Sequence, residues 1–133
     1  MHKFLIIIAI IIALLSIHPY NGYGQQMDEK VYWMVTIDVS MGKLADFHDF
    51  NGKEMSPAMD RYGYKPVVVW QTIVGDIEQV IFVAEFVNME AYNKARIKWL
   101  GSDEWKVMSK KLDLYAKKIT TKFLRSTPYS KLK

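Results

Sequence analysis

The spacing of hydrophobic residues divides residues 31–125 into strand-like and helix-like segments. Short runs that are rich in β-branched and aromatic residues are typical of strands. Longer runs, in which hydrophobic residues recur every three or four positions, are typical of amphipathic helices. The expected strands cover residues 31–39, 67–74, 79–87 and 119–125, and the expected helices cover residues 44–59, 89–100 and 103–116.

Turn and cap residues lie between these segments. Ser40 and Asn88 stand where an N-cap residue precedes a helix, and Gly101 follows the end of one. Gly75-Asp76 is expected to form a tight hairpin turn, with glycine first as in a type II′ turn. The order strand–helix–strand–strand–helix–strand indicates an α+β, ferredoxin-like fold, in which helices cover one face of a four-stranded antiparallel sheet.

Both faces of the expected sheet carry hydrophobic residues. In the third strand, Val80 and Phe82 lie on one side, and Ile81 and Val83 lie on the other. An antiparallel sheet with one face in water alternates hydrophobic with polar residues more strictly than this. Because the helices can cover only one face, a second copy of the chain is the simplest cover for the other. The sequence therefore predicts a homodimer whose two sheets face each other.

A hydrophobic run at residues 4–15 follows the basic start Met1-His2-Lys3. The run is shorter than the ~20 residues that a bilayer span needs, and this arrangement is typical of an export signal. Gly22 and Gly24 place small residues at positions −3 and −1 of a cut before Gln25. The alternative is an uncleaved N-terminal anchor.

We therefore expect four parts in the chain. Residues 1–24 are the signal peptide, residues 25–30 a flexible mature N-terminus, residues 31–125 the folded domain and residues 126–133 a C-terminal tail. The expected location is the periplasm or the outside of the cell, with no stable membrane insertion after cleavage.

The composition excludes several kinds of functional site. The chain has no cysteine, which excludes disulfides, catalytic thiols and cysteine-based metal sites. Lys3 is the only charged residue of residues 1–24, so the mature protein is one unit less positive than the whole chain at +4. This mild charge and the export signal do not indicate a nucleic-acid partner. The sequence also lacks a phosphate loop and metal-spaced histidines, so we expect no metal and no cofactor.

Three short motifs follow the pattern of a known family. Gly42-Lys43-Leu44 with Phe47 is similar to the family's G-K-L-x-x-F opening. Residues 70–81 are similar to its W-x-T-E-I-G…N-Q-V-V hairpin, and Asp103-Glu104-Trp105 is similar to its D-P-E-W helix entry. On these motifs residues 31–125 resemble NIPSNAP-type domains. The resemblance implies the dimeric α/β-barrel superfamily, which includes cofactor-free monooxygenases, lactone isomerases and haem-degrading enzymes.

The chain departs from the family pattern at positions that carry chemistry. Family members often have H-L-W in the third strand, where this chain has Phe82-Val83-Ala84. Met34 and Thr36 replace charged residues of the first strand. A haem-degrading relative needs an axial histidine, and the only histidine after residue 24 is His48, on the first helix. These departures disfavour haem degradation.

Two polar residues lie inside the hydrophobic stripe of the first helix. At about 100° per residue, His48 and Asn51 fall in the same sector as Leu44, Phe47 and Met55. Such a pair could face one pocket, with His48 as acid/base and Asn51 orienting it or a substrate carbonyl. The alternative is a hydrogen-bonded polar pair in the core or at its edge.

Aromatic strand residues supply candidate walls for a ligand. Trp70 and Tyr32, with Met55, are expected to line a hydrophobic pocket between the first helix and the sheet. The alternative is ordinary packing in the core or the dimer interface. The carboxylates Asp38 and Glu85 would become acid/base candidates if the dimer buried them, or would remain in water near the strand ends.

Charged residues of the last two helices are expected to have structural roles. Arg96, with Asp103 and Trp105, is expected to lock the junction between these helices rather than to anchor a substrate. A solvated face is expected for the lysines opposite the hydrophobic stripe, which are Lys106, Lys110, Lys111, Lys117 and Lys118.

Two classes of function follow from the residues and the resemblance. The first is an exported homodimer that binds a small hydrophobic or aromatic molecule between the first helix and the sheet. The alternative is a cofactor-free enzyme, similar to a monooxygenase or an isomerase, with His48 as acid/base. The single mature histidine and the loss of polar strand residues favour binding.

Overall fold

The computed structural model describes residues 29–132, so the expected signal peptide and most of the segment 25–30 lie outside the described residues. The strands are β1 (Val31–Val39), β2 (Lys65–Gln71), β3 (Gln79–Phe86) and β4 (Ala116–Leu124). The helical segments are α2 (Leu44–Phe50), η2 (Asn51–Met55), α3 (Ser56–Arg61), α4 (Met89–Leu100) and α5 (Asp103–Leu112). In this described part, no helix has the length and apolar character that crossing a membrane requires.

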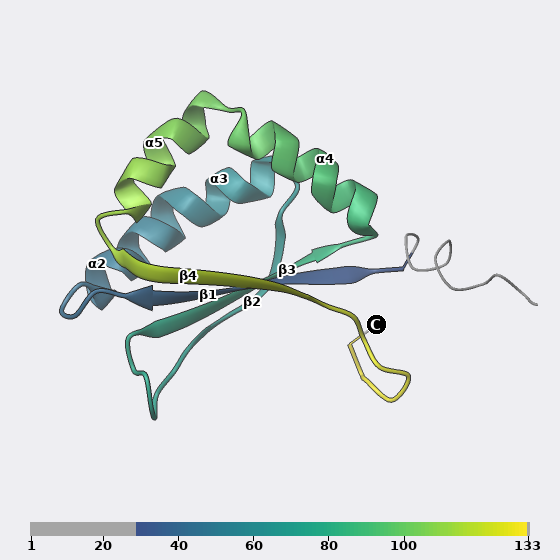
Figure 1. The fold of residues 1–133 in the computed structure, drawn as a ribbon, viewed down its shortest axis with the longest axis horizontal. Coiled ribbons are helices and arrows are strands. Elements are labelled where there is room, and N and C mark those ends of the chain that lie inside the picture. The colour runs from purple at the N-terminus through teal and green to yellow at the C-terminus, as the bar shows by residue number, and fades with distance from the viewer. Residues whose placement is uncertain (1–28, 133) are drawn as a thin grey trace, which may run out of the picture.

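The four strands form one antiparallel sheet in the order β2-β3-β1-β4. The two strands with the most buried residues, β1 and β3, are central, and Val35 of β1 lies between Phe82 of β3 and Thr121 of β4. Figure 1 shows the labelled helices gathered on one side of the sheet. This is the ferredoxin-like arrangement. The fold class expected from the sequence is therefore confirmed.

The core lies between the helices and the sheet. Phe47 of α2 and Val80 of β3 are almost completely buried there. Tyr64, Phe86 and Tyr92 pack edge to face, with the ring centroids of Phe86 lying 5.3 Å from those of both tyrosines. Burying a large apolar side chain stabilises a fold by about 1.5–3 kcal/mol. This aromatic packing fixes the position of α4 over the sheet.

The first helix runs from Leu44 to Arg61 but changes its hydrogen bonding in the middle, where η2 is a π-helical segment. A π-turn holds one residue more than an α-turn, so later residues are rotated about the axis relative to a regular α-helix. The buried positions are Phe47, Phe50, Met55, Ala58 and Met59. His48 is exposed. The expectation that His48 lies inside the buried stripe is wrong. The buried residues of α2 are Phe47 and Phe50, and His48 lies about 100° around the helix axis from Phe47, on the side away from Phe50.

Two local turns also differ from the sequence expectations. Ser40 does not cap the first helix: its carbonyl accepts the Lys43 backbone N–H at 3.0 Å in a turn, and α2 begins without a side-chain cap. The tight turn at Gly75-Asp76 is replaced by a loop of residues 72–78. The Thr72 N–H donates to the Gln79 carbonyl at 3.0 Å and closes this loop.

The third expected helix ends earlier than its hydrophobic spacing suggests. After Leu112 the Tyr115 carbonyl accepts a hydrogen bond from Ser40 N–H at 2.8 Å, and Ala116 pairs with Val39 in the sheet. Sheet pairing therefore takes Ala116 into β4, and Tyr115 lies in the connection. The caps at Asn88 and Ser102 form, because each side chain accepts a backbone N–H of the following helix.

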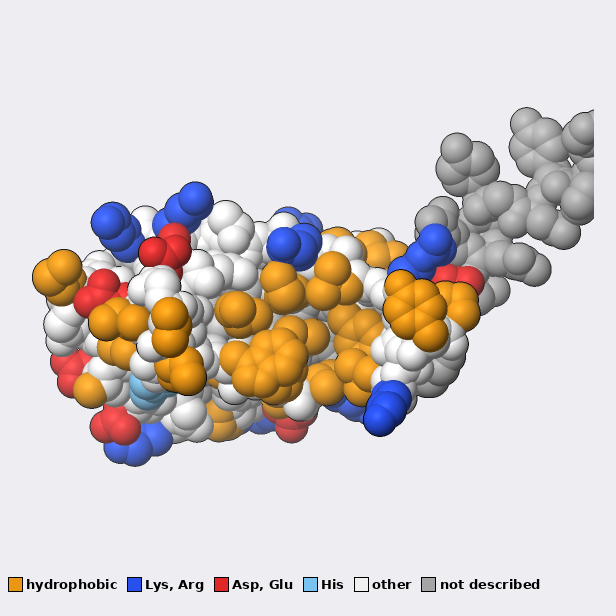
Figure 2. All heavy atoms as spheres, turned by 90° about the horizontal axis from the view of Figure 1, so that it is seen from below, with side chains coloured by type: hydrophobic (Ala, Val, Ile, Leu, Met, Phe, Trp, Pro, Cys, Tyr) orange, Lys and Arg blue, Asp and Glu red, His pale blue; other side chains and the backbone are white. Residues whose placement is uncertain are grey.

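The face of the sheet opposite the helices carries a hydrophobic patch. The strand registers place Met34, Val83 and Val68 in one row and Ile81 beside Trp70. Figure 2 shows this face, with hydrophobic side chains gathered over the middle and lysine or arginine side chains toward the rim. Trp70 is 56% exposed. We call these five residues the open-face patch; within a single chain Trp70 is exposed, Met34, Val68 and Ile81 are half-buried, and Val83 is buried.

Candidate functional site

A cavity of about 350 Å³ lies between the helices and the sheet. Its sheet side includes Trp33, Val35 and Phe82. Its helix side is formed by residues of the first helix, α4 and α5, among them Phe47, Met55, Met59, Trp99, Trp105 and Leu112. Exposed Arg96 of α4 and Thr121 of β4 also line the cavity, so it reaches the molecular surface. Aromatic walls with few polar groups are typical of small-molecule sites.

Asn51 brings an amide to the wall that the first helix provides. It is the first residue of the π-helical segment and is half-buried. Its side chain makes no hydrogen bond to the part of the chain that the structure describes, although it lines the cavity. π-Turns are frequent at functional sites. The Asn51 amide can therefore donate to, or accept from, a bound molecule.

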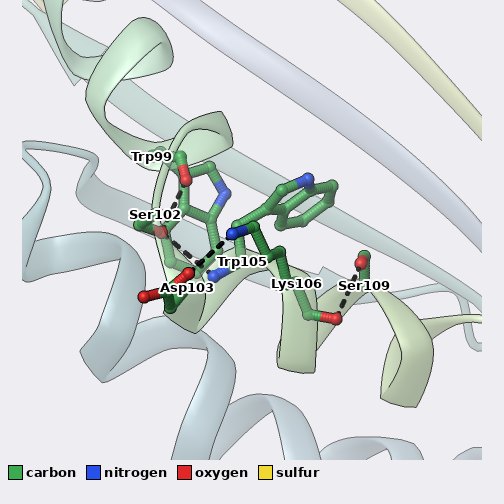
Figure 3. A network of polar contacts seen from close by, with 6 residues as sticks. All are labelled: Trp99, Ser102, Asp103, Trp105, Lys106 and Ser109. Carbon is green, nitrogen blue, oxygen red and sulfur yellow. Dashed lines mark hydrogen bonds and ion pairs between the residues drawn. The ribbon is translucent and has the colours of Figure 1, made fainter.

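The junction between α4 and α5 holds two tryptophans against the cavity. Ser102 Oγ donates to the Trp99 carbonyl at 2.7 Å and accepts the Trp105 backbone N–H at 3.0 Å, as Figure 3 shows. This N-cap fixes the short turn between the helices. The Trp99 and Trp105 ring centroids consequently lie 5.3 Å apart, and both residues line the cavity.

Two tyrosines and an arginine form the polar end of the cavity. Tyr64, Tyr92 and Arg96 all line it, and the Tyr64 and Tyr92 ring centroids are 6.3 Å apart. Burial is the main cause that raises the pKa of Tyr64 above its ordinary value of 10.0. Tyr92 raises this pKa further, and the positive charge of Arg96 lowers it. The Tyr64 hydroxyl therefore keeps its proton to a higher pH than an exposed tyrosine does.

Arg96 does not form the expected lock with Asp103. The Asp103 carboxylate instead pairs with Lys106 Nζ at 2.6 Å, three residues further along α5. The two residues lie on neighbouring positions of one helix face, which makes this pair the easier one to form. Within residues 29–132, Arg96 has no ion pair. Its guanidinium is thus available at the edge of the cavity.

His48 lies outside the cavity. Its Nε2 atom is 3.0 Å from Gln71 Oε1 at the end of β2, and both side chains are exposed. Asn51 lines the cavity and His48 does not. The structure therefore separates the two residues that the sequence places in one pocket.

Of the three expected ligand walls, Met55 lines the cavity. Trp70 and Tyr32 lie on the other side of the sheet, because strand residues alternate between faces and their neighbours Val69 and Trp33 face the helices. Tyr32 is only 4% exposed, and its hydroxyl has no hydrogen-bond partner among the described residues.

The two strand carboxylates are already engaged. Asp38 accepts a hydrogen bond from Gln79 Nε2 at 3.0 Å, and Glu85 pairs with Lys30 at 3.4 Å. Neither residue lines the cavity. Residues 29–132 hold no cluster of three or more histidine, cysteine, aspartate or glutamate side chains that could bind a metal ion.

Tyr64 and Arg96 line the cavity although the sequence patterns did not indicate either residue as part of the site. Tyr64 lies between Gly63 and Pro66, in a segment whose composition is typical of a helix end and not of a binding site. Arg96 follows Tyr92 by four positions on α4, which is the spacing of neighbours on one helix face. That spacing is the signal the sequence offers, because it places Arg96 beside a large aromatic residue on the same helix face.

Comparison with known proteins identifies the family. The NIPSNAP family model matches residues 32–131. A solved NIPSNAP family protein from Agrobacterium tumefaciens superposes with a TM-score of 0.74 at 15% identity, covering 79% of this chain and 100% of that one. An uncharacterized NIPSNAP domain protein from Burkholderia xenovorans gives 0.70 at 16% identity, covering 75% and 97%.

A second Agrobacterium tumefaciens structure, described as a NIPSNAP family protein with unknown function, gives a TM-score of 0.74 at 13% identity and covers 80% of this chain and 96% of that one. At these identities the neighbours show the fold alone. No curated protein matches the chain significantly. Because the family model spans most of the sequence, the chain belongs to the NIPSNAP family.

Proposed function

We propose that this domain binds a small hydrophobic or aromatic molecule in the helix–sheet cavity. The observation that supports the proposal is the cavity itself, whose volume of about 350 Å³ is that of a small-ligand pocket. Trp33, Phe82 and Trp99 supply apolar ring surfaces on both the sheet and the helix side. Such surfaces favour a flat, apolar ligand that packs against the rings.

Binding is favoured over turnover by the residues that line the cavity. A cofactor-free enzyme of the kind considered from the sequence needs an acid or base within hydrogen-bond reach of the bound molecule. His48 instead contacts Gln71 at the surface. Among the described residues that line the cavity there is no histidine, aspartate or glutamate.

Export and dimerisation belong to the same proposal. The basic and hydrophobic start of the sequence supports a signal peptide cut before Gln25. N-terminal sequencing of protein recovered from the periplasm or the medium should find Gln25 first, and an intact chain in the membrane fraction would show an anchor instead. The open-face patch supports a homodimer in which two sheets face each other.

The binding proposal is tested by filling the cavity from its rim. Thr121 lines the cavity from the exposed edge strand β4, so Thr121→Trp should occupy ligand space without rebuilding the core. With naphthamide as a neutral aromatic probe, we expect calorimetry to show binding to the wild type and about tenfold or greater loss of affinity in Thr121→Trp. The near-isosteric Thr121→Val should bind within about twofold of the wild type. No binding to the wild type, or equal binding to all three, would contradict the proposal.

A further inference from the structure

We propose that the molecule bound in the helix–sheet cavity is a hydrophobic or aromatic carboxylate, and that Arg96 binds its carboxylate group at the rim. This inference rests on the proposed binding function and adds the charge and the orientation of the ligand. It follows from the charges, the hydrogen-bond donors and the shape of the cavity.

Arg96 is the only charged residue among the described residues that line the cavity. The neighbouring charged groups satisfy one another elsewhere: Asp103 pairs with Lys106, and Arg61 pairs with Glu104. No carboxylate of residues 29–132 pairs with Arg96. The cavity therefore has a net positive rim and no internal anion to balance it.

The other polar groups of the cavity add donors to this cation. The Tyr64 hydroxyl is protonated near neutral pH, as tyrosine ordinarily is, and it can donate a hydrogen bond. Burial raises the pKa of Tyr64, and the positive charge of Arg96 lowers it by a smaller amount. The Asn51 amide, which has no hydrogen-bond partner in the described part of the chain, lines the same cavity. A planar guanidinium at a cavity that also has neutral donors suits a carboxylate, which accepts two parallel hydrogen bonds from arginine.

The rest of the cavity limits the ligand to one anionic group. Apart from Arg96 no charged residue of the described chain lines the cavity, and much of its wall is apolar, including Trp33, Val35 and Phe82. A second charge would lose its hydration there without a partner. A single carboxylate at the rim with an apolar body inside is the arrangement that matches these walls.

The test compares two probes that differ in charge and hardly in shape, naphthoate and its neutral amide, naphthamide. Calorimetry is carried out on the wild type, on Arg96→Met, and on Lys98→Met as the matched control. Lys98 is an exposed cation on the same helix and does not line the cavity. Circular dichroism confirms that each variant is folded.

We expect the wild type to prefer naphthoate over naphthamide. Arg96→Met should weaken naphthoate binding by about tenfold, the usual scale for losing a hydrogen bond to a charged group, and should leave naphthamide within about twofold. Lys98→Met should change neither affinity by more than about twofold. Added salt should weaken naphthoate binding more than naphthamide binding.

Three results would overturn the inference, and they are distinguishable. If naphthamide binds and naphthoate is not preferred, the cavity binds ligands but does not select a carboxylate. If Arg96→Met weakens both probes equally, Arg96 contributes packing and not charge. If neither probe binds the wild type, the proposed binding function fails, and the inference fails with it.

Discussion

At the scale of single residues, Tyr64 contributes both a buried ring to the core and a polar hydroxyl group. It is 2% exposed and its ring packs against Trp33 with centroids 5.1 Å apart. It nevertheless places a phenol at the cavity beside Tyr92 and Arg96. Burial raises the pKa of this phenol, so the phenol keeps its proton to a higher pH than an exposed tyrosine does.

Tyr64→Phe should change how stability depends on alkaline pH. The pKa of Tyr64 is raised in the folded state, while in the unfolded chain it has its ordinary value of 10.0. Above that pH the unfolded state loses a proton that the folded state keeps, so the free energy of unfolding falls as pH rises. Urea unfolding at several pH values should show a steeper alkaline decline for the wild type than for Tyr64→Phe, with no such difference near neutral pH. Parallel curves above that value would contradict the burial of a protonated Tyr64.

At the scale of elements, the π-helical segment forms part of the cavity wall. Asn51 and Met55, its first and last residues, line the cavity, whereas His48 of α2 contacts Gln71 at the surface. The segment also contains Gly52, which is exposed and leaves open space around its missing side chain. Its helical backbone therefore does not need glycine.

Gly52→Ala should stabilise the domain by about 0.5–1 kcal/mol, because alanine loses less conformational freedom in a helix and meets no neighbour here. Gly42→Ala is the matched control. Gly42 also has open space but adopts φ +75°, which alanine rarely adopts, so this variant should be less stable than the wild type. Midpoints of urea unfolding compare the two. A destabilised Gly52→Ala would show that the segment departs from helical geometry.

The order of the strands and helices could be predicted because each element carries its own hydrophobic period. The π-turn and the loop of residues 72–78 could not be predicted, because both depend on tertiary contacts of the helix and the hairpin and not on their local sequence. The same limit applies to the site. The helix pattern predicts that Asn51 and Met55 lie on the cavity side. The position of Trp70 depends on its pairing register with Ile81 of β3. Arg96 lacks an ion pair with Asp103 because Asp103 pairs with Lys106.

At the scale of the whole molecule, the two faces of the sheet differ in what covers them. One face carries the core and the cavity, and the open-face patch lies on the other. Val83 is 7% exposed within a single chain, so a charge at Val83 would disturb the fold as well as any dimer. Trp70, at 56% exposed, is the better probe of the proposed sheet-to-sheet dimer.

Trp70→Ser should weaken dimerisation without unfolding the subunit. Removing a tryptophan from the centre of an interface typically costs 2 kcal/mol or more, about a thirtyfold increase in the dissociation constant. Val107→Ser is the control, because Val107 is 53% exposed on α5, in the helix layer away from this face. Analytical ultracentrifugation over a range of concentrations measures both variants. Equal dissociation constants, or a monomeric wild type, would contradict the dimer.

The proposed binding of a small apolar molecule in the helix–sheet cavity can be measured directly through the tryptophan side chains. Of the four tryptophans, Trp33, Trp99 and Trp105 line the cavity, and Trp70 lies on the opposite face. Naphthamide titrated into isotope-labelled protein should shift the indole N–H resonances of the first three residues and leave that of Trp70 unchanged. A shift confined to Trp70, or no saturable shift at all, would contradict the claim.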